Sequence, residues 1–472
     1  MSGSNARRIR TWAATLVAVI GAATMAKADM FYVNATCGND NWTGTSSVCL
    51  APNGPKRTIQ AGIDAADPGD TVLVADGLYV GRNNYNLNFR GKSITVRSVS
   101  GPGQTTIDAQ RASSSSGFVF QGAETPEAVV EGFTITGATL SGIRVTNGAA
   151  PTIRDCALIA NWSGLVGGGV NVDSRGEITL IDCVLDRNLS GQGGGINVWE
   201  NARATLIRCT ISRNRVDITG GAAAMADRDS ILILESCIIS DNESIGFAGS
   251  SAGVRIARGS FGSLFNCLFY GNQATGSGAG ISITNDGAGE VINCTVSRNQ
   301  AAGVGAGLLV TEGVGDVVVL NTTFWENVPD QISQQGGDLS VTYSDIEGSW
   351  PGEGNISLDP QFVAPFNGDF RLGVQSPAID TGDPAYDPPG GVDLDGNRRV
   401  WNHRVDIGAY EFGSFPHGDM NCDGDINALD IEDFIDLLFN GGEPCNTCTG
   451  DTNADGNINA LDIEPFLECL FP

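Results

Sequence analysis

The sequence predicts an all-β solenoid, in which coils of about 27 residues stack on one another, followed by a small α-helical module with calcium loops. Three observations predict it. Cysteines recur through the middle of the chain at spacings of 27, 26, 28, 30 and 27 residues, an asparagine follows each of them five positions later, and two twelve-residue segments near the C-terminus repeat one Asp/Asn pattern. The 472 residues are enough for one large ordered body and one smaller module.

Residues 1–28 are predicted to be a secretory signal peptide. The segment begins with three arginines, continues through an apolar run over residues 12–23 and ends in Ala-Lys-Ala. The apolar run is too short for a membrane span, which needs about 20 residues. We therefore expect a secreted, extracellular or cell-surface protein with no membrane span.

The charge of the chain excludes one class of partner. Its 27 basic and 54 acidic residues give a net charge of −27, and removal of the predicted signal peptide leaves −31. A surface this acidic repels nucleic acid and anionic membranes. We therefore expect no nucleic-acid partner.

Residues 29–70 are predicted to form an N-terminal segment and a helical cap. In TIQAGIDAADPGD, Ile59, Ile63 and Ala66 follow helical spacing, and a helix here would close the open end of the coil stack. Cys37 and Cys49 lie close together in the sequence and are disulfide candidates in an oxidising compartment.

Residues 71–345 are predicted to form the coils. Aligned on the cysteines, they read LIDCVLDRN, LIRCTISRN, LESCIISDN, LFNCLFYGN and VINCTVSRN. The cysteine and the residue two positions later are small or apolar, with mixed residues between them, which is the alternation of a β-strand. Most copies then pass through a glycine-rich turn into a second short strand, such as GGGINV or GAGISI. Strands of successive coils would pair in parallel about 4.8 Å apart.

Stacking gives the aligned residues structural roles. An asparagine repeated at one turn places each amide against the next, so we expect an Asn ladder. The ladder residues are Asn161, Asn188, Asn214, Asn242, Asn272, Asn299 and Asn327. The cysteines are expected to pack in the interior as small apolar residues, with disulfides between coils or metal binding as the alternatives. They are Cys156, Cys183, Cys209, Cys237, Cys267 and Cys294, and Thr322 takes the next place.

The stretch TIQAGIDAADPGDTVLVADGLYV, followed by these coils, resembles the right-handed parallel β-helix family of pectate lyases and related secreted carbohydrate-active proteins. The resemblance covers residues 55–345. It implies a right-handed parallel β-helix and polysaccharide degradation by a lyase or hydrolase. Related hydrolases use clustered Asp residues with a His motif, whereas His403 and His417 both lie outside the coils.

Residues 346–412 resemble the tail that follows β-helices in large secreted bacterial proteins, and we expect a C-terminal cap of the β-helix, joined by a linker at 413–418. Its acids could bind a structural calcium ion or occupy solvated turns, and turns are the more frequent setting for Asp. These acids are Asp380, Asp383, Asp393, Asp395 and Asp406.

Residues 419–472 contain two loops of the EF-hand type, DMNCDGDINALD and DTNADGNINALD. Oxygen ligands stand at loop positions 1, 3 and 5, Gly at position 6 makes the sharp turn, position 7 offers a backbone carbonyl, and Asp replaces the usual Glu at position 12. The expected Ca²⁺ ligands are Asp419, Asn421, Asp423, Asp425 and Asp430 in one loop, and Asp451, Asn453, Asp455, Asn457 and Asp462 in the other. From Gly418 onward there are 13 acids and no Lys or Arg, so a cation is needed for folding.

The two loops, each followed by a short apolar helix, resemble a type I dockerin. The resemblance implies folding on two calcium ions and docking to a cohesin-like scaffold or cell-surface protein. It also implies that loop positions 10 and 11 help to select the partner, and here these are Ala428, Leu429, Ala460 and Leu461. Cys422, Cys445, Cys448 and Cys469 are additional disulfide candidates, and their connectivity stays open.

No catalytic motif is present in the coils, so two hypotheses stand: a polysaccharide-degrading enzyme, and a non-catalytic adhesive or carbohydrate-binding solenoid. A lyase needs carboxylates that hold calcium and a basic residue that removes a proton. Outward positions after the glycine turns supply Arg255 or Arg258 as the base, with Asp227 and Asp229 near a further calcium ion. Candidate saccharide-binding residues in the same strip are Asn171, Asp173, Asn197, Trp199, Glu200, Ser282, Asp286 and Glu312. The alternative is a solvated β-helix face.

Overall fold

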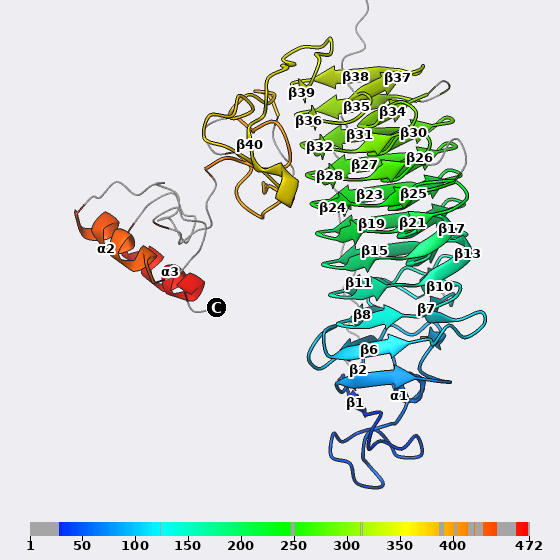
Figure 1. Cartoon of the computed structure of the whole chain (residues 1–472). Helices are drawn as coiled ribbons and strands as arrows, with labels where there is room; N and C mark the ends of the chain where they lie inside the picture. The colour runs from blue at the N-terminus through cyan, green and yellow to red at the C-terminus, as the bar shows by residue number, and fades with distance from the viewer. Residues whose placement is uncertain are drawn as a thin grey trace, which may run out of the picture.

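The computed structural model describes residues 28–122, 124–246, 251–311, 313, 315–386, 391–400, 404–413, 420, 428–440 and 459–470. The predicted signal peptide lies outside these residues, apart from its last position. The described part confirms the predicted fold class: Figure 1 shows strands stacked coil upon coil along one axis. Two helices of the C-terminal module, α2 (Asp430–Asn440) and α3 (Ile463–Leu470), follow the strands.

Four parallel sheets, named A to D here, run along the described solenoid. Sheet A contains β1 (Met30–Val33), β2 (Thr71–Val74), β5 (Thr95–Ser98), β8 (Val129–Glu131), β11 (Thr152–Arg154), β15 (Glu177–Ile181), β19 (Arg203–Ile207), β23 (Ile231–Glu235), β27 (Phe261–Phe265), β31 (Ala288–Ile292), β35 (Val317–Leu320) and β38 (Leu339–Thr342). Sheet B contains β3 (Gly77–Val80), β6 (Thr105–Asp108), β9 (Thr134–Thr136), β12 (Ala157–Ile159), β16 (Val184–Asp186), β20 (Thr210–Ser212), β24 (Ile238–Ser240), β28 (Leu268–Tyr270), β32 (Thr295–Ser297), β36 (Thr323–Trp325) and β39 (Asp345–Ile346).

Sheet C carries the candidate site. It contains β4 (Leu87–Asn88), β7 (Ser116–Phe120), β10 (Ser141–Val145), β14 (Val170–Val172), β18 (Ile196–Trp199), β22 (Ala224–Asp227), β26 (Val254–Ala257), β30 (Ile281–Thr284), β34 (Leu308–Val310) and β37 (Ile332–Gln334). The short sheet D contains β13 (Trp162–Val166), β17 (Leu189–Gln192), β21 (Arg215–Val216), β25 (Glu243–Ser244), β29 (Gln273–Ala274) and β33 (Gln300–Ala301).

Alternation of side chains explains the core. In β15, Ile178 and Leu180 are buried while Glu177, Thr179 and Ile181 are more exposed, as expected of a strand with one face inward. The same positions recur in each coil, so one continuous apolar core extends from Val33 to Ile346.

The predicted Asn ladder is confirmed. From Asn161 to Asn299, each side-chain Nδ2 donates to the Oδ1 of the next ladder residue at 2.8–3.2 Å. The backbone N–H of each residue donates to the same oxygen, and Asn327 ends the ladder by donating to Gln331 Oε1 at 2.6 Å. All the amides are buried, so the ladder satisfies polar groups that water cannot reach.

The six aligned cysteines are free and buried, which confirms the packing interpretation over inter-coil disulfides. Their thiols donate to backbone carbonyls, as Cys156 does to Val130 at 3.9 Å. Near the N-terminus, by contrast, Cys37 and Cys49 form the expected disulfide.

Helix α1 (Ile59–Ala65) packs its buried Ile59 and Ile63 against the first coil. Thr58 caps its N-terminus by accepting a hydrogen bond from the Ala61 amide. The ammonium group of Lys92 donates to the last carbonyls of the helix, including that of Ala66 at 2.6 Å. A cation at this end also complements the helix dipole.

The segment after the coils lies in a different place from the cap we expected. The loop at 347–356 follows the last coil and packs Trp350 against the core, while the rest, with β40 (Phe362–Ala364), η1 (Pro365–Asn367) and β41 (Asp369–Leu372), lies along the side of sheet B (Figure 1). Phe370 there packs against Leu268 and Tyr270. The sequence could not reveal this because the contact joins segments about 100 residues apart.

Candidate functional site

The strip predicted on the β-helix corresponds to one row of sheet C. Parallel pairing in register aligns Asn171 with Asn197, Asn197 with Met225, Met225 with Arg255, and Arg255 with Ser282. The structure therefore brings these residues together, with Met225 interrupting the polar row.

Glycine-rich turns cover this row, which the sequence did not reveal. Gly167 and Gly193 adopt left-handed backbone conformations, at φ +61° and +60°, directly over Asn171 and Asn197. A Cβ at either glycine would lie 2.6–2.7 Å from the Cβ of the asparagine beneath it, so no other residue fits. As a result Asn171, Asn197 and Ser282 are at most 5% exposed. The expected role of Asn171 and Asn197 in direct contact with a ligand is therefore corrected to support of the surface, whereas Ser282 lines a pocket.

The buried amides form a chain that leads to the surface. Asn197 Nδ2 donates to Asn171 Oδ1 at 2.9 Å, and Asn171 Nδ2 donates to Asp173 Oδ2 at 2.9 Å. Asp173 is half-buried at the end of its strand. The chain therefore holds the Asp173 carboxylate in a defined position.

Arginines surround a buried carboxylate at the end of β22. Asp227 is 1% exposed, and its Oδ1 lies 3.5 Å from Arg258 Nη1. Burial raises the pKa of Asp227, while the positive charges of Arg258, Arg255 and Arg228 act in the opposite direction. Burial also lowers the pKa of Arg255, with Asp227 opposing the shift. The ionisation of Asp227 therefore depends on the neighbouring arginines, and that of Arg255 depends on Asp227. Water has little access to this cluster.

Trp199 and two charged residues form the outer part of the cluster. The Arg228 guanidinium lies 4.3 Å from the centre of the Trp199 ring, a cation–π contact, and its Nη1 lies 3.1 Å from Glu200 Oε1. Sequence reasoning missed Arg228, which occupies the left-handed turn after β22 at φ +57°. Its position in the coil could have identified it, because Glu200 and Arg258 occupy the corresponding left-handed turns after the neighbouring strands.

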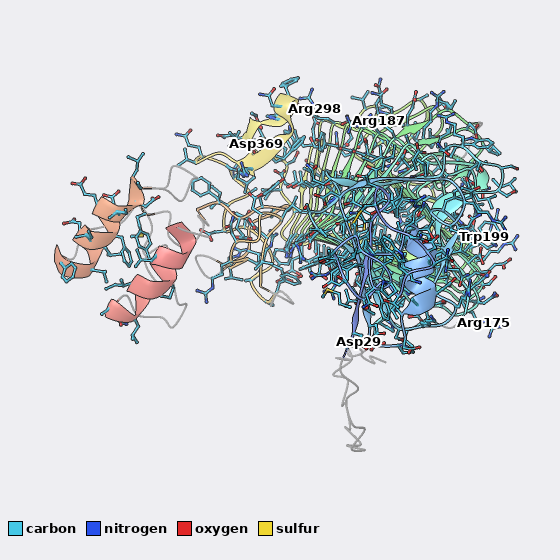
Figure 2. The ribbon with its side chains drawn as sticks, turned by 90° about the horizontal axis from the view of Figure 1, so that it is seen from below. Asp29, Arg175, Arg187, Trp199, Arg298 and Asp369 are labelled. Carbon is cyan, nitrogen blue, oxygen red and sulfur yellow. A yellow bond between two sulfur atoms is a disulfide. The ribbon has the colours of Figure 1, made fainter. Side chains whose placement is uncertain are left out.

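Two pockets lie at the turns that follow sheet C. One, of about 520 Å³, is lined by Asn147, Ser174, Arg175, Glu200 and Asn201. The other, of about 510 Å³, is lined mainly by Arg255, Ser282, Thr284, Asn285, Thr311 and Gln335. We call these two pockets and the Asp227 cluster the polar strip. Figure 2 shows Arg175 and Trp199 on the side of the solenoid remote from the C-terminal segment.

The expected calcium site beside Asp227 and Asp229 finds no support. No group of three or more His, Cys, Asp or Glu side chains that could hold a metal ion occurs in the described residues. Asp229 and Asp286 are exposed on separate turns, and Glu312 lies outside the described residues.

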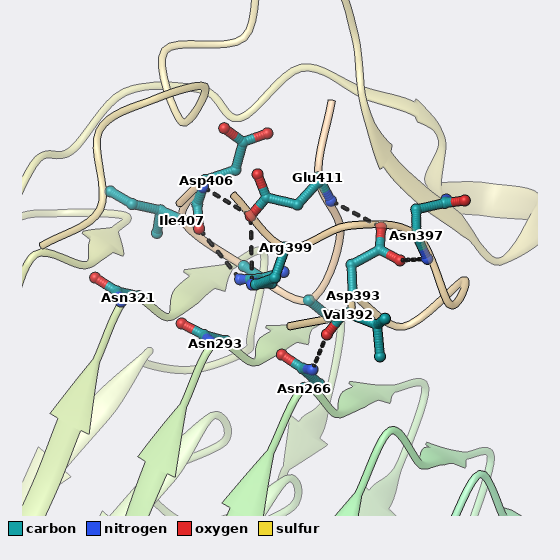
Figure 3. Close-up of polar contacts among 12 residues, drawn as sticks. Asn266, Asn293, Asn321, Val392, Asp393, Asn397, Arg399, Asp406, Ile407 and Glu411 are labelled. Atoms are coloured by element: carbon teal, nitrogen blue, oxygen red, sulfur yellow. Dashed lines mark hydrogen bonds and ion pairs between the residues drawn. The ribbon is translucent and has the colours of Figure 1, made fainter. Parts of the chain in front are cut away.

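The acids of the C-terminal segment also act as turn and core residues (Figure 3). Asp393 Oδ1 accepts hydrogen bonds from the amides of Asp395 and Asn397, and Asp406 accepts from the amides of Asp380 and Phe412. This supports the turn interpretation over calcium. Asp383 donates its amide to Asn321, and Asp395 pairs with Arg371.

A buried ion pair and a row of asparagines hold this segment in place. Arg399 Nε lies 3.3 Å from Glu411 Oε1, and both side chains are fully buried. Burial raises the pKa of Glu411, while the positive charge of Arg399 acts in the opposite direction. Asn266, Asn293 and Asn321, from successive coils, face the segment, and Asn266 Nδ2 donates to the Val392 carbonyl at 2.6 Å (Figure 3).

In the C-terminal module, two of the ten predicted calcium ligands lie in the described residues. Asp430 and Asp462 are fully buried, and each accepts a backbone hydrogen bond, from Met420 at 2.7 Å and from Asn459 at 2.8 Å. Two buried carboxylates at helix starts stand at loop position 12, where paired calcium loops carry a ligand. Asp419, Asn421, Asp423, Asp425, Asp451, Asn453, Asp455 and Asn457 lie outside the described residues.

The predicted partner-binding residues are at the surface of this module. Leu429 and Leu461 are 68% and 67% exposed, and Ala428 and Ala460 are exposed as well. Along α2 the exposed Ile431, Ile435 and Phe439 continue this apolar surface at helical spacing. The rings of Phe434 and Phe466 stack with their centroids 3.9 Å apart and form the core between the helices.

Comparisons with known proteins match both parts of the chain. A family model described as a right-handed beta helix region matches residues 96–324, and one for the dockerin type I domain matches residues 417–465. A crystal structure of the pectate lyase Pel9A matches with a TM-score of 0.52 and 16% identity, covering 82% of this chain and 97% of that one. At this identity, the likeness shows the fold.

A second structure, of a GH136 lacto-N-biosidase from Eubacterium ramulus, matches with a TM-score of 0.31 and 11% identity, covering 66% of this chain and 68% of that one. A search of curated proteins gave no match. Among the described helices, none is long and apolar enough to cross a membrane.

Proposed function

We propose that this chain, a pectate lyase-like parallel β-helix with a C-terminal dockerin type I domain, acts on an acidic polysaccharide outside the cell while the dockerin domain holds it on a cohesin-like scaffold. The observation that carries the proposal is the pocket around Arg255. Among the described residues, its lining has a guanidinium, hydroxyls and amides, and no carboxylate. Such groups are suited to a sugar carboxylate and its neighbouring hydroxyls.

The polar strip has the dimensions that a polymer requires. It extends over successive coils from Asn147 to Gln335, and each coil advances about 4.8 Å along the solenoid axis. Successive sugar units could therefore contact successive turns. The net charge of −27 opposes an acidic ligand at long range, but screening over about 8 Å at physiological salt leaves the local arginines dominant.

For an elimination reaction, Arg255 is the better-placed base. Burial lowers its pKa, whereas Arg258 is half-exposed and pairs with Asp227. The base would remove the proton beside the sugar carboxylate, the glycosidic C–O bond would break, and a C=C bond would form at the new chain end. Asp227 would hold the arginine side chains in position.

Calcium belongs to the dockerin domain in this proposal, with two sites that Asp430 and Asp462 would complete. When bound, the ions would supply the positive charge that the acidic module lacks. Leu429 and Leu461 with their preceding alanines would then form two equivalent cohesin-binding surfaces. A further calcium ion on the β-helix would have to arrive with the substrate.

A second candidate function, non-catalytic binding, is favoured by a different observation. Three carboxylates in or next to the strip already have partners: Asp227 with Arg258, Glu200 with Arg228, and Asp173 with Asn171. Engaged groups of this kind provide a surface for adhesion more readily than they provide acid–base chemistry.

The experiment incubates the protein with a panel of acidic and neutral polysaccharides, with and without calcium, and follows unsaturated-uronide absorbance and new reducing ends. Arg255→Gln should abolish elimination, and Arg203→Gln, which changes an exposed arginine on sheet A, should leave it unchanged. Binding of an acidic glycan without product would favour the adhesive function. Absence of both binding and product would refute the proposal.

A further inference from the structure

A pocket of about 750 Å³ lies at the C-terminal end of the solenoid, apart from the polar strip. Its walls come from the turn at Arg298, residues 326–332, residues 346–350 and Phe366 of η1. Figure 2 shows Arg298 beside Asp369 of the C-terminal segment, on a different side from Trp199 and Arg175. The pocket therefore forms where the side-docked segment meets the last coils.

One wall presents an aromatic ring that is held in place without being covered. Phe366 is 81% exposed, yet the Arg298 guanidinium lies 3.6 Å from the centre of its ring. Arg298 Nη1 lies 3.3 Å from Glu326 Oε2, which completes a ring–cation–carboxylate stack. Because the ring already has a defined orientation, little side-chain conformational entropy is lost when a ligand stacks on it.

Another part of the lining is fixed by the end of the Asn ladder. Gln331 accepts from Asn327 and donates its Nε2 to Glu347 Oε2 at 2.7 Å, and the Glu326 amide donates to the same oxygen at 2.9 Å. Glu347 is exposed, and these two hydrogen bonds hold its carboxylate in place. The scaffold thus positions an acceptor beside the aromatic wall.

The charge and shape of the lining select the ligand class. Glu326, Asp330 and Glu347 outnumber the single lining cation, so an anionic sugar is repelled. The Arg298 guanidinium also places a positive charge behind the Phe366 ring, so a cation stacked on the exposed face of that ring would be repelled. Trp350, Phe366 and Val328 offer apolar surface for the C–H face of a sugar ring, and the carboxylates accept from its hydroxyls.

We propose that this pocket binds a neutral sugar unit of a glycan chain. It is a second carbohydrate site, independent of the acidic ligand assigned to the polar strip. A protein with both sites would hold a neutral glycan at the end of the solenoid while an acidic one occupies its side.

The test measures binding of neutral hexaoses with glucan, xylan and mannan backbones to the full-length protein by calorimetry and saturation-transfer NMR. We expect one of them to bind and Phe366→Ala to weaken it by about tenfold or more. Val374→Ala, which truncates another exposed side chain of the same segment, and Arg255→Gln in the polar strip should both leave this binding unchanged.

The proposal is overturned if no neutral hexaose binds, if Phe366→Ala binds as tightly as the wild type, or if Arg255→Gln removes the neutral ligand. Should Phe366→Ala fail to fold, Glu347→Gln, which keeps the shape of the pocket, must weaken binding instead. If Arg255→Gln loses only the binding of acidic glycans, the result concerns the polar strip and does not contradict the neutral-sugar site.

Discussion

Replacing one rung of the Asn ladder tests the central structural argument. In Asn242→Ala, the backbone amide and the Nδ2 group of Asn214 lose their shared acceptor, which they contact at 2.9 and 3.1 Å. The carbonyl of Ile211 loses its donor, which now lies at 2.9 Å. The ladder asparagines and Ile211 are all buried, so water cannot replace the lost hydrogen bonds.

The magnitude follows from the number of groups left without partners. Each buried polar group deprived of its hydrogen bond costs about 1–3 kcal/mol. Because a shift of the chain can restore part of this, we expect a loss of about 3–5 kcal/mol in the free energy of unfolding for the two amide groups and the carbonyl together.

The assay is urea unfolding followed by circular dichroism, with Gln273→Ala as the control. Gln273 is exposed one residue after the next rung, so its loss should change stability by about 0.5 kcal/mol or less. If Asn242→Ala costs no more than this control, the ladder is incidental to stability and the reasoning is refuted.

Three further predictions concern charged groups. Burial raises the pKa of Asp345 to about 7, so its contribution to stability is full below about pH 4 and is lost as the pH rises through 7; Asp345→Asn should therefore raise the melting temperature relative to wild type more at pH 8 than at pH 5. Lys92→Met removes the donor to the last carbonyls of α1, and we expect a loss of about 1–2 kcal/mol, read out as faster amide exchange in that helix and unchanged exchange in the central coils. In the dockerin domain, Asp462→Ala should weaken the calcium-induced gain of helical circular dichroism, whereas Asp433→Asn on exposed α2 surface should not; equal effects would contradict a ligand role for the buried acid.

Periodicity explains which features could be predicted from sequence. The ladder from Asn161 to Asn327 and the column of cysteines repeat in successive coils, so one alignment of the coils indicates that these side chains point inward and are buried. The docking of the C-terminal segment depends on contacts such as Asn266 with Val392, which join distant parts of the chain. Asn266, Asn293 and Asn321 do recur with the period of the coils, but their recurrence does not identify the segment that they contact. The pocket at Phe366 also depends on such contacts, because its walls meet only after that docking.

The glycine turns show why the candidate site itself was predicted only in part. Alternation correctly separates Asn171 and Asn197 from the core, but it carries no information about what lies on their other side. Gly167 and Gly193 fold back over them because a left-handed turn with no Cβ permits that close approach. Apart from Arg255 and Ser282, which line a pocket, the accessible polar side chains are consequently displaced to the strand ends and the following turns. Arg228 and Glu200 show the consequence: they reach solvent because their turns lie beyond the glycine cover, so a search for functional residues in this fold belongs at those turns.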